Sequence, residues 1–213
     1  MPCLDIFLIW RMHSAIIQFM KRILYNRATR VLIITNALIL LSAAMLGPFY
    51  AVFVEKIGGD ILEAGTAFGI FAFVAGIATL VSSRFADTAT RDERILSLGY
   101  LLVGIGFFAY LFVGSVRELF LVQILIGLGE AIYAPAFDKL FSQHLTIMKM
   151  ARQWGAWEAN YYFMLGLGAV IGGMIINYFG FSVMFIIMGA LSLTSSVYLY
   201  YLPKEVLKSK VNE

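Results

Sequence analysis

Charged residues are scarce in this sequence of 213 residues. Asp, Glu, Lys and Arg together make up only 14% of it, whereas an average soluble domain has about 25%. Apolar residues reach 61%, and the mean hydropathy is +0.86. A single soluble core could not bury so many apolar side chains, and a disordered chain would contain far fewer of them. The net charge of +3 is modest, so we also expect no nucleic-acid partner, because such binding needs a strongly basic surface.

Cysteine and histidine are nearly absent as well. Cys3 is the only cysteine, so no disulfide can form within the chain. His13 and His144 are the only histidines, which leaves too few ligands for a metal centre built from Cys and His. We therefore predict no metal site and no cofactor.

Long apolar runs dominate what the sequence does contain. A helix needs about 20 mostly apolar residues to cross the hydrocarbon of a membrane. Six stretches reach this length: Val31–Val54, Ile61–Ser83, Ile95–Ser115, Leu119–Phe141, Ala156–Tyr178 and Phe181–Leu202. The sequence thus predicts an all-α membrane protein with a domain of six transmembrane helices over residues 31–202.

The positions of Lys and Arg orient these spans. If both termini are cytoplasmic, 14 of the 16 basic residues lie on the cytoplasmic side, and only Lys56 and Arg117 lie outside. Cytoplasmic loops are enriched in Lys and Arg, so this distribution favours an even number of spans with both ends inside. Residues 203–213 are then a cytoplasmic tail, and the expected location is the cell membrane, in contact with its lipid.

The basic segment before the first span, residues 1–30, has two interpretations. Its apolar run Leu4–Met20 is interrupted by charges and lacks the small-residue cleavage site of a secretory signal. One interpretation is an amphipathic helix in the membrane interface. The other is a start codon assigned too early, in which case translation begins at Met20 and the chain opens with a short basic lead.

Glu130 is the only acid deep within a span. Steps of three and four residues place it on one helix face with other polar or small residues, namely Gln123, Gly127, Ala134 and Asp138. A similar stripe in the first span contains Asn36, Ala43, Gly47 and Tyr50. We interpret these two stripes as the walls of a water-filled path.

Charges within hydrocarbon are costly and usually functional, so Glu130 is a candidate to carry a proton or to contact a substrate. A hydrogen-bonded structural acid is the alternative. Asn36 equally suits a helix-to-helix contact. Aromatic residues of the spans, including Phe68, Phe71 and Phe107, are interpreted as contacts with lipid and between helices.

Small residues and prolines indicate how the spans pack. Gly168 and Gly172 are spaced by four residues, which lets two membrane helices approach closely. Pro48 and Pro135 lie within spans and predict kinks in the first and fourth.

The link after the second span also contains charges. Arg91 in this link is predicted to reach Asp138 at the cytoplasmic end of the fourth span, and the two would form a switchable ion pair.

Together these features resemble the N-terminal half of a transporter of the major facilitator superfamily. Asp87 and Arg91 match the motif G-x-x-x-D-x-x-G-R that the family has in the link between its second and third helices, although Ser83 and Thr90 replace the two glycines. The fourth span matches a second motif at Gly127, Gly129, Pro135 and Ala136, with Gln123 where the family often has arginine. The fifth span resembles a glycine-rich pattern at Gly168, Gly172 and Gly173, without its proline.

The resemblance implies a secondary transporter of a small solute that works by alternating access, with protons as a candidate coupling ion. It implies that the first and fourth spans line the cavity and that Asp87 and Arg91 bias one gate state. Family members have two such halves, so this chain would need a second copy of itself or a separately encoded half. A non-transporting assembly or regulatory subunit and a truncated remnant are the alternatives. An intramembrane protease would need a G-x-S-G string and a histidine within a span, and both are absent, so no enzymatic activity is predicted.

Overall fold

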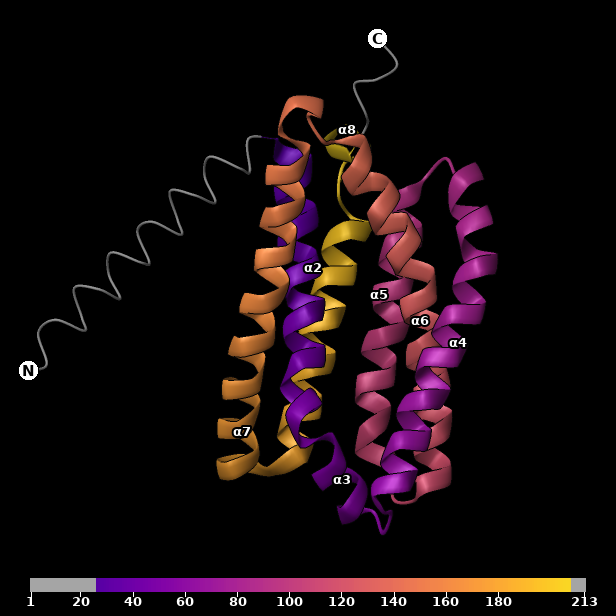
Figure 1. Ribbon diagram of the computed structural model, residues 1–213, viewed down its shortest axis with the longest axis vertical. Coiled ribbons are helices and arrows are strands. Elements are labelled where there is room, and N and C mark those ends of the chain that lie inside the picture. Colours follow the sequence, from indigo (N-terminus) through magenta and orange to yellow (C-terminus); the bar gives the residue numbers. More distant parts are fainter. Residues whose placement is uncertain (1–25, 208–213) are drawn as a thin grey trace, which may run out of the picture.

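The computed structural model describes residues 26–207, and every regular element within them is a helix. The predictions for residues 1–25, including the start at Met20, and for residues 208–213 of the tail lie outside the described residues. The helices run side by side along the long axis of the molecule (Figure 1). Their bounds are α2 Arg27–Leu46, η1 Gly47–Phe49, α3 Tyr50–Lys56, α4 Ile61–Thr88, α5 Asp92–Ala109, η2 Tyr110–Phe112, α6 Val116–Gln143, η3 Ile147–Lys149, α7 Met150–Tyr200 and α8 Lys204–Leu207.

Five helical stretches of the described chain are long and apolar enough to cross a membrane, and the last of them contains α7. The 51 residues of α7 are interrupted at Gly180, whose φ of 82° and ψ of 176° suit glycine because it has no Cβ. The segments before and after Gly180 run antiparallel in Figure 1. The all-α membrane fold is therefore confirmed, whereas the number of crossings and the side of each terminus stay predictions.

Several boundaries differ from those that hydropathy predicts. α4 continues to Thr88 and α5 begins at Asp92, so only three residues join them. α7 begins at Met150, within the stretch that hydropathy assigns to a loop. Hydropathy finds the part of a helix that suits hydrocarbon, and these helices continue beyond it into polar sequence. The starts of α4 and α6 are fixed instead by capping boxes, Asp60 with Glu63 and Ser115 with Glu118.

The two prolines act differently. At Pro48 the first predicted span is divided, because α2 ends at Leu46 and the 3-10 turn η1 precedes α3. At Pro135 helix α6 continues without a break. Proline has no N–H to donate to the carbonyl four residues earlier, which belongs to Ala131. The Ser82 hydroxyl of α4 donates to this carbonyl instead, as neighbouring helices commonly do for prolines in membranes.

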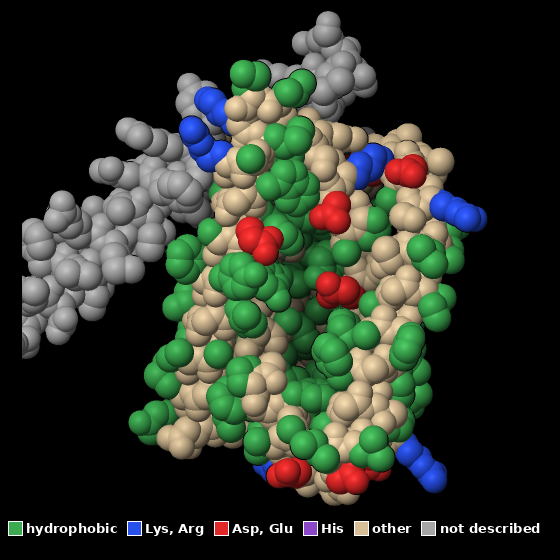
Figure 2. Space-filling model, viewed as in Figure 1, with side chains coloured by type: hydrophobic (Ala, Val, Ile, Leu, Met, Phe, Trp, Pro, Cys, Tyr) green, Lys and Arg blue, Asp and Glu red, His purple; other side chains and the backbone are tan. Residues whose placement is uncertain are grey.

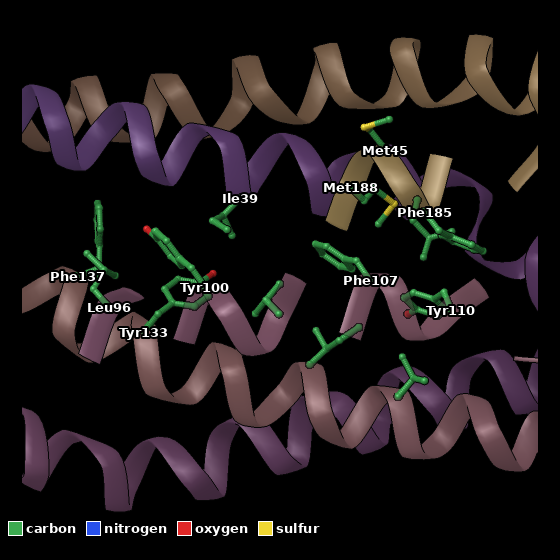
Figure 3. Close-up of a cluster of buried hydrophobic side chains, with 14 of the residues drawn as sticks. Ile39, Met45, Leu96, Tyr100, Phe107, Tyr110, Tyr133, Phe137, Phe185 and Met188 are labelled. Carbon is green, nitrogen blue, oxygen red and sulfur yellow. The ribbon is translucent and has the colours of Figure 1, made fainter. Parts of the chain in front are cut away.

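The bundle packs as pairs of neighbouring helices. α2 packs mainly against α7 and α4 against α6, while α5 contacts both α6 and α7. Aromatic side chains fill much of the core between them, with Tyr100 beside Tyr133 and Tyr110 beside Phe185 (Figure 3).

Glycines allow the closest approaches between helices. A Cβ on Gly172 would lie 2.2 Å from the Met45 carbonyl oxygen of α2. A Cβ on Gly129 would lie 2.9 Å from the backbone nitrogen of Val103 in α5. Similar contacts surround the other glycines that the sequence singles out: Gly127 approaches α4, Gly168 approaches α2, and Gly173 approaches Phe49.

Serines connect the second segment of α7 to its neighbours. Ser97 of α5 and Ser196 of α7 each donate a hydrogen bond to the other's backbone carbonyl, both at 2.8 Å. Ser195 donates to the Thr35 carbonyl of α2 at 2.7 Å. All three serines are buried, so these bonds replace the water that their hydroxyl groups would otherwise need.

Candidate functional site

A cavity of about 410 Å³ lies among α2, α3, α4, α5, α6 and α7. Figure 2 shows a hollow on this side of the molecule, with hydrophobic walls and acidic side chains at its margin. Three of the residues that the sequence predicts for the site line the cavity: Tyr50, Gln123 and Glu130. A cavity of this volume is of the size that binds a small organic molecule.

The cavity lining is mainly apolar and aromatic. Seven of its 17 residues have aromatic rings: Tyr50, Phe68, Phe71, Phe107, Tyr110, Tyr133 and Tyr161. The aliphatic lining comes mostly from α2 and includes Ile39, Leu40 and Ala43. Three of the phenylalanines interpreted as lipid and helix contacts thus lie on the cavity wall. The sequence does not distinguish them, because α4 and α5 are apolar on every side.

The polar groups of the cavity are few and come mainly from one face of α6. Gln123 donates a hydrogen bond from its amide nitrogen to the Tyr50 hydroxyl, which joins α6 to α3 across the wall. Glu130 lies two turns further along α6 and is half-buried. The Tyr133 hydroxyl is its hydrogen-bonding partner. Within residues 26–207 no Lys, Arg or His lines the cavity, and Glu130 is the only acidic residue of this lining.

Asn36 does not line the cavity. Its side-chain amide donates to the Tyr100 hydroxyl and accepts from the Trp157 indole, both at 3.3 Å, and the residue is only 3% exposed. The Tyr100 ring contacts Tyr133 edge to face at 4.9 Å. Asn36 therefore joins α2 to α5 and α7 behind the cavity wall, as the helix-contact interpretation anticipates.

The predicted gate residues lie at the other end of α4 and α6. Asp87 and Asp138 are exposed, and Arg91 directly precedes α5. Among the described residues no ion pair joins Arg91 to Asp138.

The ion pair at this end of the bundle joins the residues that directly follow Arg91 and Asp138 in the chain, namely Asp92 and Lys139. Lys139 contacts Asp92 at 3.0 Å and also donates to the Ala86 carbonyl at 2.6 Å. Sequence reasoning missed Lys139, although its position beside Asp138 could have suggested it. Its single ammonium group connects the end of α4, the start of α5 and the end of α6.

No group of three or more metal-ligating side chains gathers anywhere in residues 26–207. The described lining of the cavity thus combines one carboxyl group with many aromatic rings.

Comparison with known proteins identifies the family. Residues 32–213 match the family model of the Major Facilitator Superfamily. The chain belongs to the Major Facilitator Superfamily. This confirms the resemblance noted in the sequence, and it makes the protein an integral membrane protein of a transporter family.

Two curated proteins are similar to this chain in sequence. One is an uncharacterised transporter of this superfamily from Methanocaldococcus jannaschii, 22% identical over 183 residues, which covers 86% of this chain and 47% of the relative. The other is the multidrug resistance protein MdtG of Yersinia enterocolitica, 23% identical over 183 residues, which covers 84% of this chain and 44% of the relative. The matched region thus spans less than half the length of each of these superfamily relatives.

Proposed function

We propose that this chain is one half of a secondary transporter that moves a small solute across the cell membrane by alternating access. A second copy of the chain, or a separately encoded half, completes the path. Membership of a transporter family supports the general role. The observation that carries the proposal is the cavity itself, in which Glu130, Gln123 and Tyr50 place polar groups within an apolar lining.

Glu130 is the proposed functional centre of this cavity. It lies midway along α6 and faces a space large enough for a small solute. An acid at this depth is costly unless it interacts with a proton, a cation or a substrate. We propose that it carries a coupling proton or contacts the solute, while Gln123 and Tyr50 orient the solute beside it.

The outer surfaces of α4 and α7 support pairing with a second half. Only 11% of the apolar window of α4 and 22% of that containing α7 are buried. Gly65, Gly69 and Gly76 on α4 have no atom within 4 Å of a Cβ position, so another helix could approach this stripe closely. The matched region covers 47% and 44% of the two relatives, which supports the proposal that the path includes a further half.

We propose that the short link between α4 and α5 biases one state of the gate. Asp87 and Arg91 lie at its two ends, and Asp138 lies nearby on α6 beside Lys139, whose ammonium group bonds to both sides of the link. Moving this end of the bundle would break or form these contacts. The link therefore has groups that could favour one arrangement over another.

Transport by reconstituted protein tests the proposal. The full chain is placed in proteoliposomes, and uptake of a panel of radiolabelled small solutes is followed with and without a proton gradient. Glu130→Gln should abolish coupled movement of a transported solute while the protein remains folded. Glu158→Gln is the matched control, because it removes the same charge from an exposed position outside the cavity lining. Normal transport by Glu130→Gln would remove Glu130 from the mechanism.

The native mass in a gentle detergent tests the pairing. A species near twice 23.8 kDa would support a homodimer. A species of 23.8 kDa that transports no solute would favour the alternatives, a non-transporting subunit or a remnant.

A further inference from the structure

The charge of the cavity is negative and is not balanced within its wall. Of the 17 lining residues, Glu130 alone is an acidic or basic residue, since the lining contains no other Asp or Glu and no Lys, Arg or His. The ion pair found among the described residues, Lys139 with Asp92, involves neither Glu130 nor any other lining residue. A negatively charged solute would be repelled by this carboxylate, and a neutral one would leave it without a counter-ion.

Aromatic rings surround the same space. They come from α3, α4, α5, η2, α6 and α7, so an occupant would meet rings from several sides. The face of an aromatic ring attracts a cation, most strongly where water is excluded. An apolar wall with rings on several sides and one carboxylate is therefore selective for a cation with an apolar body.

The remaining polar groups of the cavity lining do not favour an anion over a cation. The Gln123 amide donates to Tyr50 within the wall, and Tyr133 is the partner of Glu130. These neutral groups orient an occupant without attracting an anion. The described part of the cavity lining thus contains none of the cationic donors that recognise carboxylates or phosphates.

From this juxtaposition we infer that the cavity binds an organic cation with an aromatic or apolar body, and that the Glu130 carboxylate is its counter-ion. The inference rests on the proposed function for the location of the site. It concerns binding alone, so it can be tested without transport.

A series of three probes of nearly equal size tests the charge preference. The probes are N-methyl-4-phenylpyridinium, 4-methylbiphenyl and 4-phenylbenzoate, which are cationic, neutral and anionic. Equilibrium binding of each is measured to the purified full chain in lipid nanodiscs. The cation should bind at least about tenfold more tightly than the other two, the size of effect that one buried charge-assisted contact provides. Equal or tighter binding of the neutral or anionic probe would overturn the inference, and this comparison needs no variant.

Two matched pairs of variants then locate the site. Glu130→Gln should weaken binding of the cationic probe about tenfold or more and leave binding of the neutral probe unchanged, whereas Glu158→Gln should change neither. Tyr161 lines the cavity but its neighbour Tyr162 does not, so Tyr161→Leu should weaken cation binding about threefold and Tyr162→Leu should not. Partition of a probe into lipid is the same for every variant and cancels in these comparisons. Unchanged cation binding by Glu130→Gln would exclude it as the counter-ion.

The outcomes separate this inference from the proposed function. Transport of another solute, with no selective binding of the cationic probe, would refute the inference and leave the transporter intact. Selective binding without movement in proteoliposomes would support the cation site and refute transport by the chain alone.

Discussion

The hydrogen bond from Ser82 to the Ala131 carbonyl leads to a prediction about stability. The cost of removing the Ser82 hydroxyl should depend on whether Pro135 is present. Ala131 is fully buried, and its carbonyl lacks a helical donor because Pro135 follows four residues later. Ser82→Ala would remove the donor that α4 supplies. A buried polar group that loses its partner costs about 1–3 kcal/mol, whereas hydrogen bonds between membrane helices average about 0.6 kcal/mol. We therefore expect Ser82→Ala to lower the free energy of unfolding by about 1–2 kcal/mol.

A second variant in this experiment, Pro135→Ala, restores the missing backbone N–H donor. In Pro135→Ala the new N–H can donate to the Ala131 carbonyl, as in any other helix. Ser82→Ala should then cost less than about 0.5 kcal/mol, because the carbonyl no longer depends on Ser82. The difference between the two backgrounds, about 1 kcal/mol, is a coupling free energy and does not depend on how Pro135→Ala acts by itself.

The assay is unfolding in mixed micelles by titration with a denaturing detergent, followed by the far-ultraviolet helix signal. It compares the original chain, the two single variants and the double variant. Ser83→Ala is the matched control, since the hydroxyl of Ser83 bonds only to Leu80 of its own helix, at 3.3 Å. An equal cost of Ser82→Ala with and without Pro135 would refute the reasoning.

Two more predictions concern close packing and the charged link. Gly172→Ala should destabilise the fold by about 1–3 kcal/mol, because its Cβ would meet the backbone of Met45. Gly166→Ala, which meets no atom within 4 Å, should be neutral or stabilising by up to about 1 kcal/mol in the same unfolding assay; similar losses for both would contradict this. Lys139→Met should cost about 1–2 kcal/mol, since it removes the bond to Asp92 and a second one to a carbonyl, while water partly screens the ammonium group because its side chain is 22% exposed. Arg152→Met is an exposed control that changes the same charge, and an equal effect of the two would show that net charge alone is responsible.

Helical periodicity predicts part of the cavity wall on α6 and along α2, η1 and α3, although Gly127, Ala134 and Asp138 of the predicted α6 stripe do not line the cavity. Steps of three and four residues from Glu130 find Gln123, and the same spacing finds Ala43, Gly47 and Tyr50, all of which line the cavity. Asn36 lies on the same predicted stripe, but Tyr100 and Trp157 occupy its amide. These partners lie 64 and 121 residues away in the chain, so no local pattern could have found them.

Helical periodicity does not predict which face of an entirely apolar helix points toward the core of the bundle. In a soluble protein the polar side of a helix marks the surface, whereas lipid and core are both apolar in a membrane. Phe68 and Phe73 of α4 are both more than half exposed, yet only Phe68 lines the cavity. The charged residues near the link between α4 and α5 show a similar limit, because the sequence does not reveal which of two adjacent charges forms an ion pair. The ion pair there joins Asp92 and Lys139 and not their neighbours Arg91 and Asp138, because helix rotation decides which of two adjacent charges meets its partner.

The two proposals together lead to one further prediction about charge. If a second copy of the chain completes the path by two-fold symmetry, two Glu130 carboxylates face one shared space. Two like charges in a medium of low dielectric constant repel each other, so an occupant with two positive charges would relieve more of this repulsion than one with a single charge. We expect the homodimer to bind 1,1′-dimethyl-4,4′-bipyridinium about tenfold more tightly than N-methyl-4-phenylpyridinium, and Glu130→Gln to abolish this preference. A dimeric native mass without any preference for the dication would mean that the two carboxylates do not share a cavity, because a shared cavity cannot hold two carboxylates without favouring the more positive occupant.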